Sequence, residues 1–201
     1  MYAVNYHRAK SVAEAVKLAK GDAKFLSGGM TLIPAMKTRL AAPSDVIDLT
    51  HIKELKGVTV SGKNVTIGAA TTHYDVATNE KLAKVCPAIC YLASMIGDPA
   101  VRHRGTIGGS ISNNDPAADY PAAMLALGAT ITTNKRTLPA DKFFKGLFET
   151  ALKDGEVVTS VSFTAPAKCG YAKFPNPASR YAMTGVFVAK HGNGDVRVAV
   201  T

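Results

Sequence analysis

The chain has 201 residues, 47% hydrophobic and 19% charged, a composition typical of a globular protein with a real core, and no apolar run approaches the roughly 20 residues of a membrane span. Its 24 Lys and Arg against 15 Asp and Glu give a formal net charge of +9, but the basic residues are scattered and no aromatic residues alternate with them, which argues against nucleic-acid binding. The first eight residues lack the apolar core of a secretion signal, so we expect a cytoplasmic protein without a membrane span.

The N-terminal part of the chain shows a strand–helix–strand pattern. Residues 11–14 (Ser-Val-Ala-Glu) match a helix-capping box, and the helix that they begin is expected to end at Gly21. The next elements are expected to be a short buried strand over 23–27, a helix over 30–38 and a strand over 45–49. Two short strands joined by a helix imply parallel pairing, so we place a small parallel βαβ subdomain at residues 1–55.

From Gly57 onward the pattern contains more strands. Alternating β-branched residues over 58–60 and 65–67 predict a hairpin. Helices are expected over 74–78, over 82–96 with an interruption near Pro87, and over 118–127, and strands over 130–133 and 157–163. We place a larger, antiparallel-sheet subdomain at residues 56–170.

The C-terminal residues predict two strands, over 181–190 and 196–201, around the turn signal of residues 191–195 (His-Gly-Asn-Gly-Asp). Two strands alone are marginally stable. They therefore either pair with the rest of the chain or belong to a further domain, and we expect residues 171–201 to be the start of a truncated C-terminal domain.

Two glycine pairs are the most informative feature of the sequence. Gly28-Gly29 and Gly108-Gly109 are each expected between a strand and a helix, about eighty residues apart. Adjacent glycines allow positive φ and close approach of a ligand to the backbone, and their exposed N–H groups favour phosphate. Hydroxyl groups flank both pairs, at Ser27, Thr31, Thr106 and Ser110. The pattern predicts a clasp that holds a pyrophosphate from both sides.

Three further residues have two interpretations each. Asp119 follows the second glycine pair at a distance suited to the sugar hydroxyls of a cofactor, or it stabilises a helix start. Lys173 and Tyr181, among aromatic residues, either line the far side of a planar ring or form a solvated face with a strand aromatic. We include all three among the candidate cofactor-binding residues.

Other motifs are weaker. Gly57 and the Gly62-Lys63-Asn64 segment resemble a P-loop, but the hydroxyl residue is missing and the glycines fall in a hairpin. No histidine forms a convincing catalytic group, and no residue is assigned a catalytic or metal-binding role. Cys86 and Cys90 have helical i, i+4 spacing and are interpreted as buried thiols rather than metal ligands.

Taken together, these residues resemble the FAD-binding (medium) subunit of the molybdenum hydroxylase family, as in aerobic carbon monoxide dehydrogenase and xanthine dehydrogenase. The resemblance covers nearly the whole chain and is carried by residues 6–8, 23–40, 67–69, 102–110, 115–121 and 178–181. It implies an α+β, PCMH-type FAD-binding fold with a small parallel βαβ subdomain and a larger antiparallel-sheet subdomain. By their match to the family motifs, the residues implied to bind FAD are Leu26, Ser27, Gly28, Gly29, Met30, Thr31, Leu32, Ile33, Thr106, Ile107, Gly108, Gly109, Ser110 and Asp119.

The resemblance also implies a function. In such a subunit, FAD receives electrons from a molybdopterin subunit through an iron–sulfur subunit and passes them to an external acceptor. Two alternatives stay open: a standalone FAD-dependent oxidoreductase, and a non-enzymatic scaffold that has lost flavin. Met30 stands where relatives often carry a polar residue, so only its backbone can bind FAD. We expect Gly28→Val and Gly109→Val each to abolish FAD binding and leave the fold intact.

Overall fold

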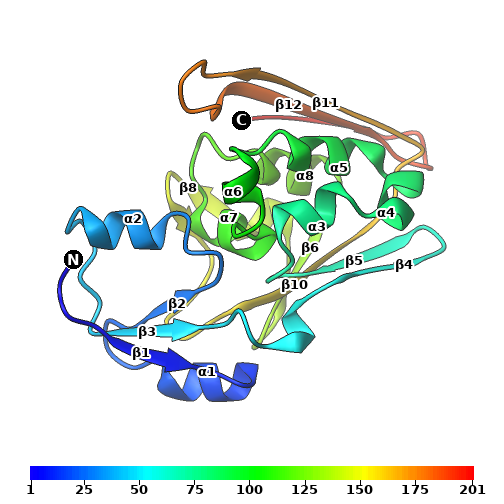
Figure 1. Ribbon diagram of the computed structural model, residues 1–201. Helices are drawn as coiled ribbons and strands as arrows, with labels where there is room; N and C mark the ends of the chain where they lie inside the picture. Colours follow the sequence, from blue (N-terminus) through cyan, green and yellow to red (C-terminus); the bar gives the residue numbers. More distant parts are fainter.

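The structure is a computed structural model that describes residues 1–201. Its N-terminal part is a three-stranded parallel sheet in the order β1-β3-β2, formed by β1 (Asn5–Arg8), β2 (Lys24–Leu26) and β3 (Asp45–Asp48). Two helices, α1 (Val12–Leu18) and α2 (Leu32–Lys37), lie on opposite sides of this sheet (Figure 1). The predicted parallel βαβ unit is therefore confirmed. Strand β1 was not predicted, because its sequence is polar and largely exposed.

One half of the predicted capping box at the start of α1 is present. The side chain of Ser11 accepts a hydrogen bond from the backbone N–H of Glu14, which satisfies one of the free donors of the first turn. The carboxylate of Glu14 reaches back to the backbone N–H of Lys10, one residue earlier than the capping box requires. The helix ends at Leu18, and Gly21 follows in a left-handed conformation with φ of 59°.

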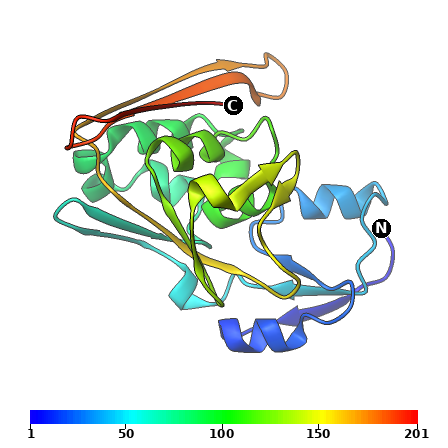
Figure 2. The ribbon, with the colours of Figure 1, turned by 180° about the vertical axis from the view of Figure 1, so that it is seen from behind.

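The larger part of the molecule is built on a five-stranded antiparallel sheet. Its order is β4-β5-β10-β6-β7. The strands are β4 (Val58–Ser61), β5 (Asn64–Gly68), β6 (Thr130–Thr133), β7 (Thr137–Pro139) and β10 (Val158–Thr164). A short 3-10 helix, η1 (Lys53–Leu55), leads into the sheet. Helix α9 (Ala140–Phe143) and the small hairpin of β8 (Phe144–Gly146) and β9 (Glu149–Thr150) lie beside the sheet and face the viewer in Figure 2. The P-loop-like segment forms the β4–β5 hairpin, as expected from its sequence.

Six helices cover one face of this sheet. They are α3 (His73–Ala77), α4 (Glu80–Val85), α5 (Pro87–Ser94), α6 (Pro99–Arg102), α7 (Ile107–Asn113) and α8 (Tyr120–Ala126). The predicted break near Pro87 separates α4 from α5, because proline lacks the N–H that a continuous helix needs. The second glycine pair lies in the first turn of α7 and follows α6, so the strand expected before it is wrong. Asp98 and Pro99 start a helix there instead.

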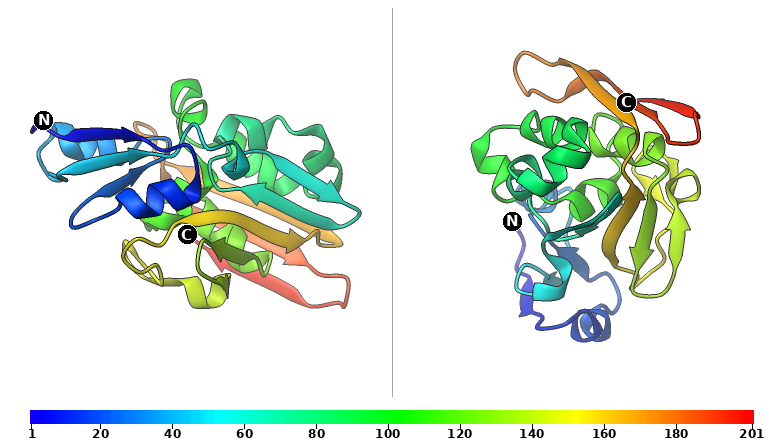
Figure 3. Two further views of the ribbon diagram at one scale, coloured as in Figure 1. Left: turned by 90° about the horizontal axis from the view of Figure 1, so that it is seen from below. Right: turned by 90° about the vertical axis from the view of Figure 1, so that its right-hand side faces the viewer.

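A third sheet covers the other side of the helices. It is antiparallel, in the order β11-β12-β13, and consists of β11 (Lys168–Pro175), β12 (Ala182–Lys190) and β13 (Val196–Val200). Strand β11 was not predicted, since Gly170 and two lysines interrupt its apolar pattern. The two C-terminal strands thus pair with the rest of the chain. Figure 3 shows the small N-terminal sheet and this C-terminal sheet at opposite ends of the molecule.

The hydrophobic side chains form two clusters. The larger contains 29 buried residues and joins the five-stranded sheet, the helices and the C-terminal sheet. The smaller contains 8 buried residues, mainly from the N-terminal part, but also Ala70, which follows β5, and Val157, which precedes β10. The N-terminal part is therefore packed onto the rest of the chain. The domain boundaries at 55/56 and 170/171 stay predictions. None of the helices has the length and apolarity required to cross a membrane.

Candidate functional site

A cavity of about 880 Å³ lies where the N-terminal part meets the larger part. Its wall contains the loop between β2 and α2, residues near the starts of α7 and α8, Lys173 and residues 178–181. Every candidate residue lines this cavity except Ile33 and Ile107. The Ile107 side chain is fully buried in the larger core, and the Ile33 side chain contacts Gly29. These two residues do not line the cavity, and their part in FAD binding stays a prediction.

The first glycine loop has free hydrogen-bond donors. The backbone N–H groups of residues 27–32 donate no hydrogen bond within the protein. Gly28 and Gly29 are both buried, and Gly29 has a φ of 77°. Buried backbone N–H groups are almost always paired in folded proteins, so this loop is built to receive an acceptor. The expectation of a phosphate-binding loop fits the observed geometry here.

The second glycine loop differs from the expectation. The backbone N–H groups of residues 107–110 all donate within the protein, to the carbonyl groups of Thr71, Ala69 and Thr106 and to the Thr106 hydroxyl. Thr106 is the N-cap of α7. Its hydroxyl and carbonyl oxygens accept hydrogen bonds from the N–H groups of Gly109 and Ser110, which were expected to be free. The expected nest of exposed N–H groups is therefore wrong at this loop. What it presents is the bare Cα of Gly109 and nearby hydroxyl groups.

The two loops contact each other directly. The hydroxyl groups of Ser27 and Thr106 are 2.9 Å apart. A Cβ atom on Gly28 would lie 2.1 Å from the carbonyl oxygen of Arg104, so only glycine allows this backbone approach. The first glycine pair therefore has two roles: it lines the cavity, and through Gly28 it allows the two loops to contact each other.

Asp119 lies at the centre of a buried polar cluster. Lys173 Nζ is 2.9 Å from Asp119 Oδ1, and the two side chains are only 1% and 5% exposed. Lys173 also donates to the carbonyl of Met95, and the Tyr171 hydroxyl donates to Asp119. Burial and the Asp119 carboxylate raise the pKa of Tyr171, which keeps its hydroxyl protonated as a donor.

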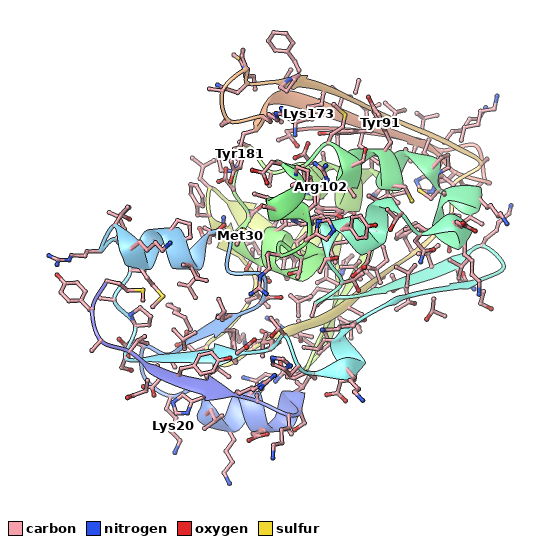
Figure 4. The ribbon with its side chains drawn as sticks, in the orientation of Figure 1. Lys20, Met30, Tyr91, Arg102, Lys173 and Tyr181 are labelled. Atoms are coloured by element: carbon pink, nitrogen blue, oxygen red, sulfur yellow. The ribbon has the colours of Figure 1, made fainter.

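This cluster bears on the interpretations that the sequence left open. Asp119 is the N-cap residue of α8, as the helix-start interpretation expected, but its side chain makes no capping hydrogen bond and is held by Lys173 and Tyr171 instead. The buried ammonium of Lys173 excludes a solvated face at that position. Tyr181 is 52% exposed and lines the cavity. Figure 4 shows Met30 near the start of α2 and Tyr181 close to the C-terminal sheet, with Lys173 deeper along that sheet.

His73 lines the cavity, although the sequence analysis assigned it no role. Its ring is buried beside Gly105, and its Nδ1 atom has no hydrogen-bond partner. Burial lowers the pKa of His73 to about 4, with a smaller contribution from Arg102, so the ring is neutral at pH 7. One signal could have identified it: like the first glycine loop, His73 lies where the chain passes from a strand to a helix, since β5 ends at Gly68 and His73 is the first residue of α3.

The parallel βαβ unit, the antiparallel sheet and the loop with free N–H groups define an α+β, PCMH-type FAD-binding domain. The family model described as "FAD binding domain in molybdopterin dehydrogenase" matches residues 2–166. The chain belongs to this family, whose cofactor is FAD, and it is an FAD-binding subunit of the molybdenum hydroxylase type.

Individual relatives agree with this assignment. The carbon monoxide dehydrogenase medium chain of Hydrogenophaga pseudoflava is 38% identical over 210 residues, which cover 98% of this chain and 73% of that protein. The medium chain of Afipia carboxidovorans is 41% identical over 169 residues, 81% of this chain and 59% of that protein. In a solved structure of the Hydrogenophaga pseudoflava enzyme, one chain superposes with a TM-score of 0.92 at 37% identity, covering 98% of this chain and 74% of that chain.

Proposed function

We propose that this chain is the electron-transfer subunit of a molybdenum-containing hydroxylase, assembled with an iron–sulfur subunit and a molybdopterin subunit. Relatives at 38% and 41% identity are named as medium chains of carbon monoxide dehydrogenase, which supports assembly with further subunits. When bound, FAD supplies the redox chemistry that links iron–sulfur clusters to an external acceptor. The residues of this chain bind and orient it. A cytoplasmic location stays a prediction.

The observation that carries the proposal is the row of free N–H groups over residues 27–32. Two of them belong to the buried residues Gly28 and Gly29, and none of the six donates to an acceptor within the protein. A pyrophosphate carries several strong acceptor oxygens, and such a row of donors matches it. The candidate residues that line the cavity therefore fit FAD.

We assign separate tasks to the candidate residues. Residues 27–32 hold the pyrophosphate through their backbone, including the N–H of Met30, and Leu26 lines the cavity beside them. Residues 106–110 form the opposite wall, where Gly109 keeps the approach open and the Thr106 and Ser110 hydroxyls are available. Ile107 supports the second loop from inside the core, and the half-buried Ile33 packs against Gly29 in the first loop.

Asp119, Lys173 and Tyr181 serve the rest of the cofactor. Asp119 accepts from a sugar hydroxyl, because a carboxylate has more acceptor positions than Tyr171 and Lys173 fill. Lys173 adds a positive charge beside it in a region shielded from water, where it stabilises negative charge on a bound ring more than it would in solvent. Tyr181 lies at the cavity wall with half of its surface exposed, which suits a ring cover.

The test is a reconstitution in two stages. The purified protein is titrated with FAD, and flavin absorption and fluorescence are followed; we expect saturable binding of one FAD per chain. Partner subunits are then added, and flavin reduction is measured after the substrate of the molybdopterin subunit is supplied. We expect reduction only when the iron–sulfur subunit is present. A chain that binds no FAD would support the scaffold, and flavin reduction by a small donor without partners would support the standalone oxidoreductase.

A further inference from the structure

Two of the three cysteines lie close together, although 83 residues separate them in the chain. The Sγ atoms of Cys86 and Cys169 are 3.7 Å apart, and both residues are free thiols. Cys86 is fully buried between α4 and α5, whereas Cys169 is half-buried on β11. Figure 1 shows β11 along the outer side of α5, and the two elements are in contact. The pair therefore joins the helical layer to the C-terminal sheet.

The surroundings make the two thiols unequal. The hydrogen bond from Cys86 and the backbone N–H of Ala88 favour the thiolate and hold the pKa of Cys169 below its ordinary value, although burial opposes this. The same hydrogen bond and the deeper burial raise the pKa of Cys86. Because the thiolate is the reactive form of cysteine and Cys169 is the more accessible of the two, Cys169 is the nucleophile of the pair.

We propose that Cys169 and Cys86 form a peroxide-reactive site that hydrogen peroxide converts into a disulfide. First, the Cys169 thiolate sulfur attacks one peroxide oxygen: an S–O bond forms, the O–O bond breaks, and hydroxide leaves. Cys169 is then a sulfenic acid, oxidised by two electrons. Next, the Cys86 sulfur attacks the Cys169 sulfur: the S–S bond forms, the S–O bond breaks, and hydroxide leaves with the thiol proton as water. In total, two thiols and one peroxide give one disulfide and two waters.

The geometry permits bond formation with small movements. A disulfide bond is about 2.05 Å long, so sulfur atoms that are 3.7 Å apart must approach by about 1.7 Å. Strand β11 also carries Tyr171 and Lys173, which bind Asp119 in the cavity. The disulfide would anchor this strand to the start of α5, two residues before Tyr171. Cys90 is the internal comparison, since it is buried and its Sγ donates to the carbonyl of Asn79, at 4.0 Å, rather than to either of the two paired thiols.

The test treats the purified protein with hydrogen peroxide, with and without a dimedone-type trap for sulfenic acids, and reads the products by intact-protein and peptide mass spectrometry. Without the trap, we expect a loss of about 2 Da from two thiol hydrogens and a cross-linked peptide that contains Cys86 and Cys169. In Cys86→Ala, we expect the trap to label Cys169 and no disulfide to form. Cys169→Ser should abolish both products, and Cys90→Ala should form the disulfide as the unchanged protein does.

Three results would overturn the proposal: a pair that stays reduced when peroxide oxidises other residues, a disulfide that involves Cys90, or trapping at Cys86 in Cys169→Ser. If Cys86→Ala does not fold, the unchanged protein is labelled with iodoacetamide before and after peroxide treatment. This labelling also tests whether Cys86 and Cys169 are oxidised together. Both Cys86 and Cys169 must then lose labelling together while Cys90, after unfolding, remains fully labelled.

Discussion

Gly28 and Arg104 are in direct backbone contact, although they belong to different glycine loops. A Cβ atom on Gly28 would lie 2.1 Å from the Arg104 carbonyl oxygen and 2.6 Å from the Cα atom of Gly105. Backbone atoms cannot turn aside as the end of a flexible side chain can. Glycine carries only a hydrogen atom where every other residue carries a Cβ atom. The two walls of the cavity can therefore lie this close together only with glycine at position 28.

Gly28→Ala should consequently separate the two loops. We expect the free energy of unfolding to fall by about 1–3 kcal/mol, as for other overpacked sites. FAD affinity should fall at least tenfold, which corresponds to about 1.4 kcal/mol. Urea denaturation and FAD titration check the two effects. The matched control is Gly170→Ala, because nothing lies within 4 Å of a Cβ atom there; equal behaviour of the two variants would contradict the prediction.

Gly109→Val should act differently from Gly28→Val. The nearest atom to a Cβ on Gly109 is the Thr106 hydroxyl oxygen, at 3.0 Å, and the added side chain projects at the cavity wall rather than into packed backbone. We expect loss of FAD binding with a change in unfolding free energy below about 1 kcal/mol, typical of sites outside the core. For Gly28→Val, the expectation of an intact fold no longer holds, since the loop contact must open. Urea denaturation and FAD titration of both variants test this difference. A Gly28→Val variant as stable as the unchanged protein would contradict it.

The parts of the fold that local sequence signals determine could be predicted. The capping residue Ser11, the β4–β5 hairpin and the break at Pro87 depend on neighbours within a few residues, and all were correct. Strand β11 could not be predicted in this way. Its side chains Tyr171 and Lys173 are stabilised by Asp119, more than 50 residues away in the chain, rather than by an alternating pattern.

For the candidate site, the sequence predicted the location of the cavity but not its hydrogen bonding. Glycine pairs and hydroxyl residues located the cavity, because few residue types allow close backbone approach. They could not reveal which N–H groups are free. At the second loop, the carbonyl groups of Thr71 and Ala69 accept from Ile107 and Gly108, and both acceptors lie just after β5, more than 35 positions earlier in the chain. Only the three-dimensional arrangement shows that the first loop alone keeps its donors.

Lys173→Met should leave the Asp119 carboxylate buried without its counter-ion. Breaking a buried ion pair by removing one partner typically costs about 3–5 kcal/mol of folding stability. Asp119→Asn should cost a similar amount, because the Lys173 ammonium is then unpaired. In the double variant, we expect a smaller loss than the sum of the two, by about 1 kcal/mol or more, since neither charge remains. Urea denaturation of the three variants measures this coupling, and strictly additive losses would contradict it.

Glu156 should make stability fall in acid. Its side chain is fully buried and accepts from the Arg136 guanidinium, the Thr133 hydroxyl and the backbone N–H of Lys153. These hydrogen bonds, led by that of Arg136, lower the pKa of Glu156 to about 2 against the opposing effect of burial. The native state therefore binds the proton more weakly than the unfolded chain, whose glutamate pKa is about 4.3. The stabilisation is complete above that value and is lost as the pH falls toward about 2.

The pH profile of unfolding tests this assignment. A difference of roughly two pKa units corresponds to about 3 kcal/mol at most, lost between about pH 5 and pH 2. In Glu156→Gln, stability should be lower at pH 7, because Arg136 loses its counter-ion, and this part of the acid dependence should disappear. The exposed Glu149→Gln serves as the control and should keep the profile of the unchanged protein. If Glu156→Gln lost stability in acid as steeply as the control, another carboxylate would have to be responsible, because the glutamine side chain does not titrate and its hydrogen bonds to Thr133 and Lys153 do not depend on pH in this range.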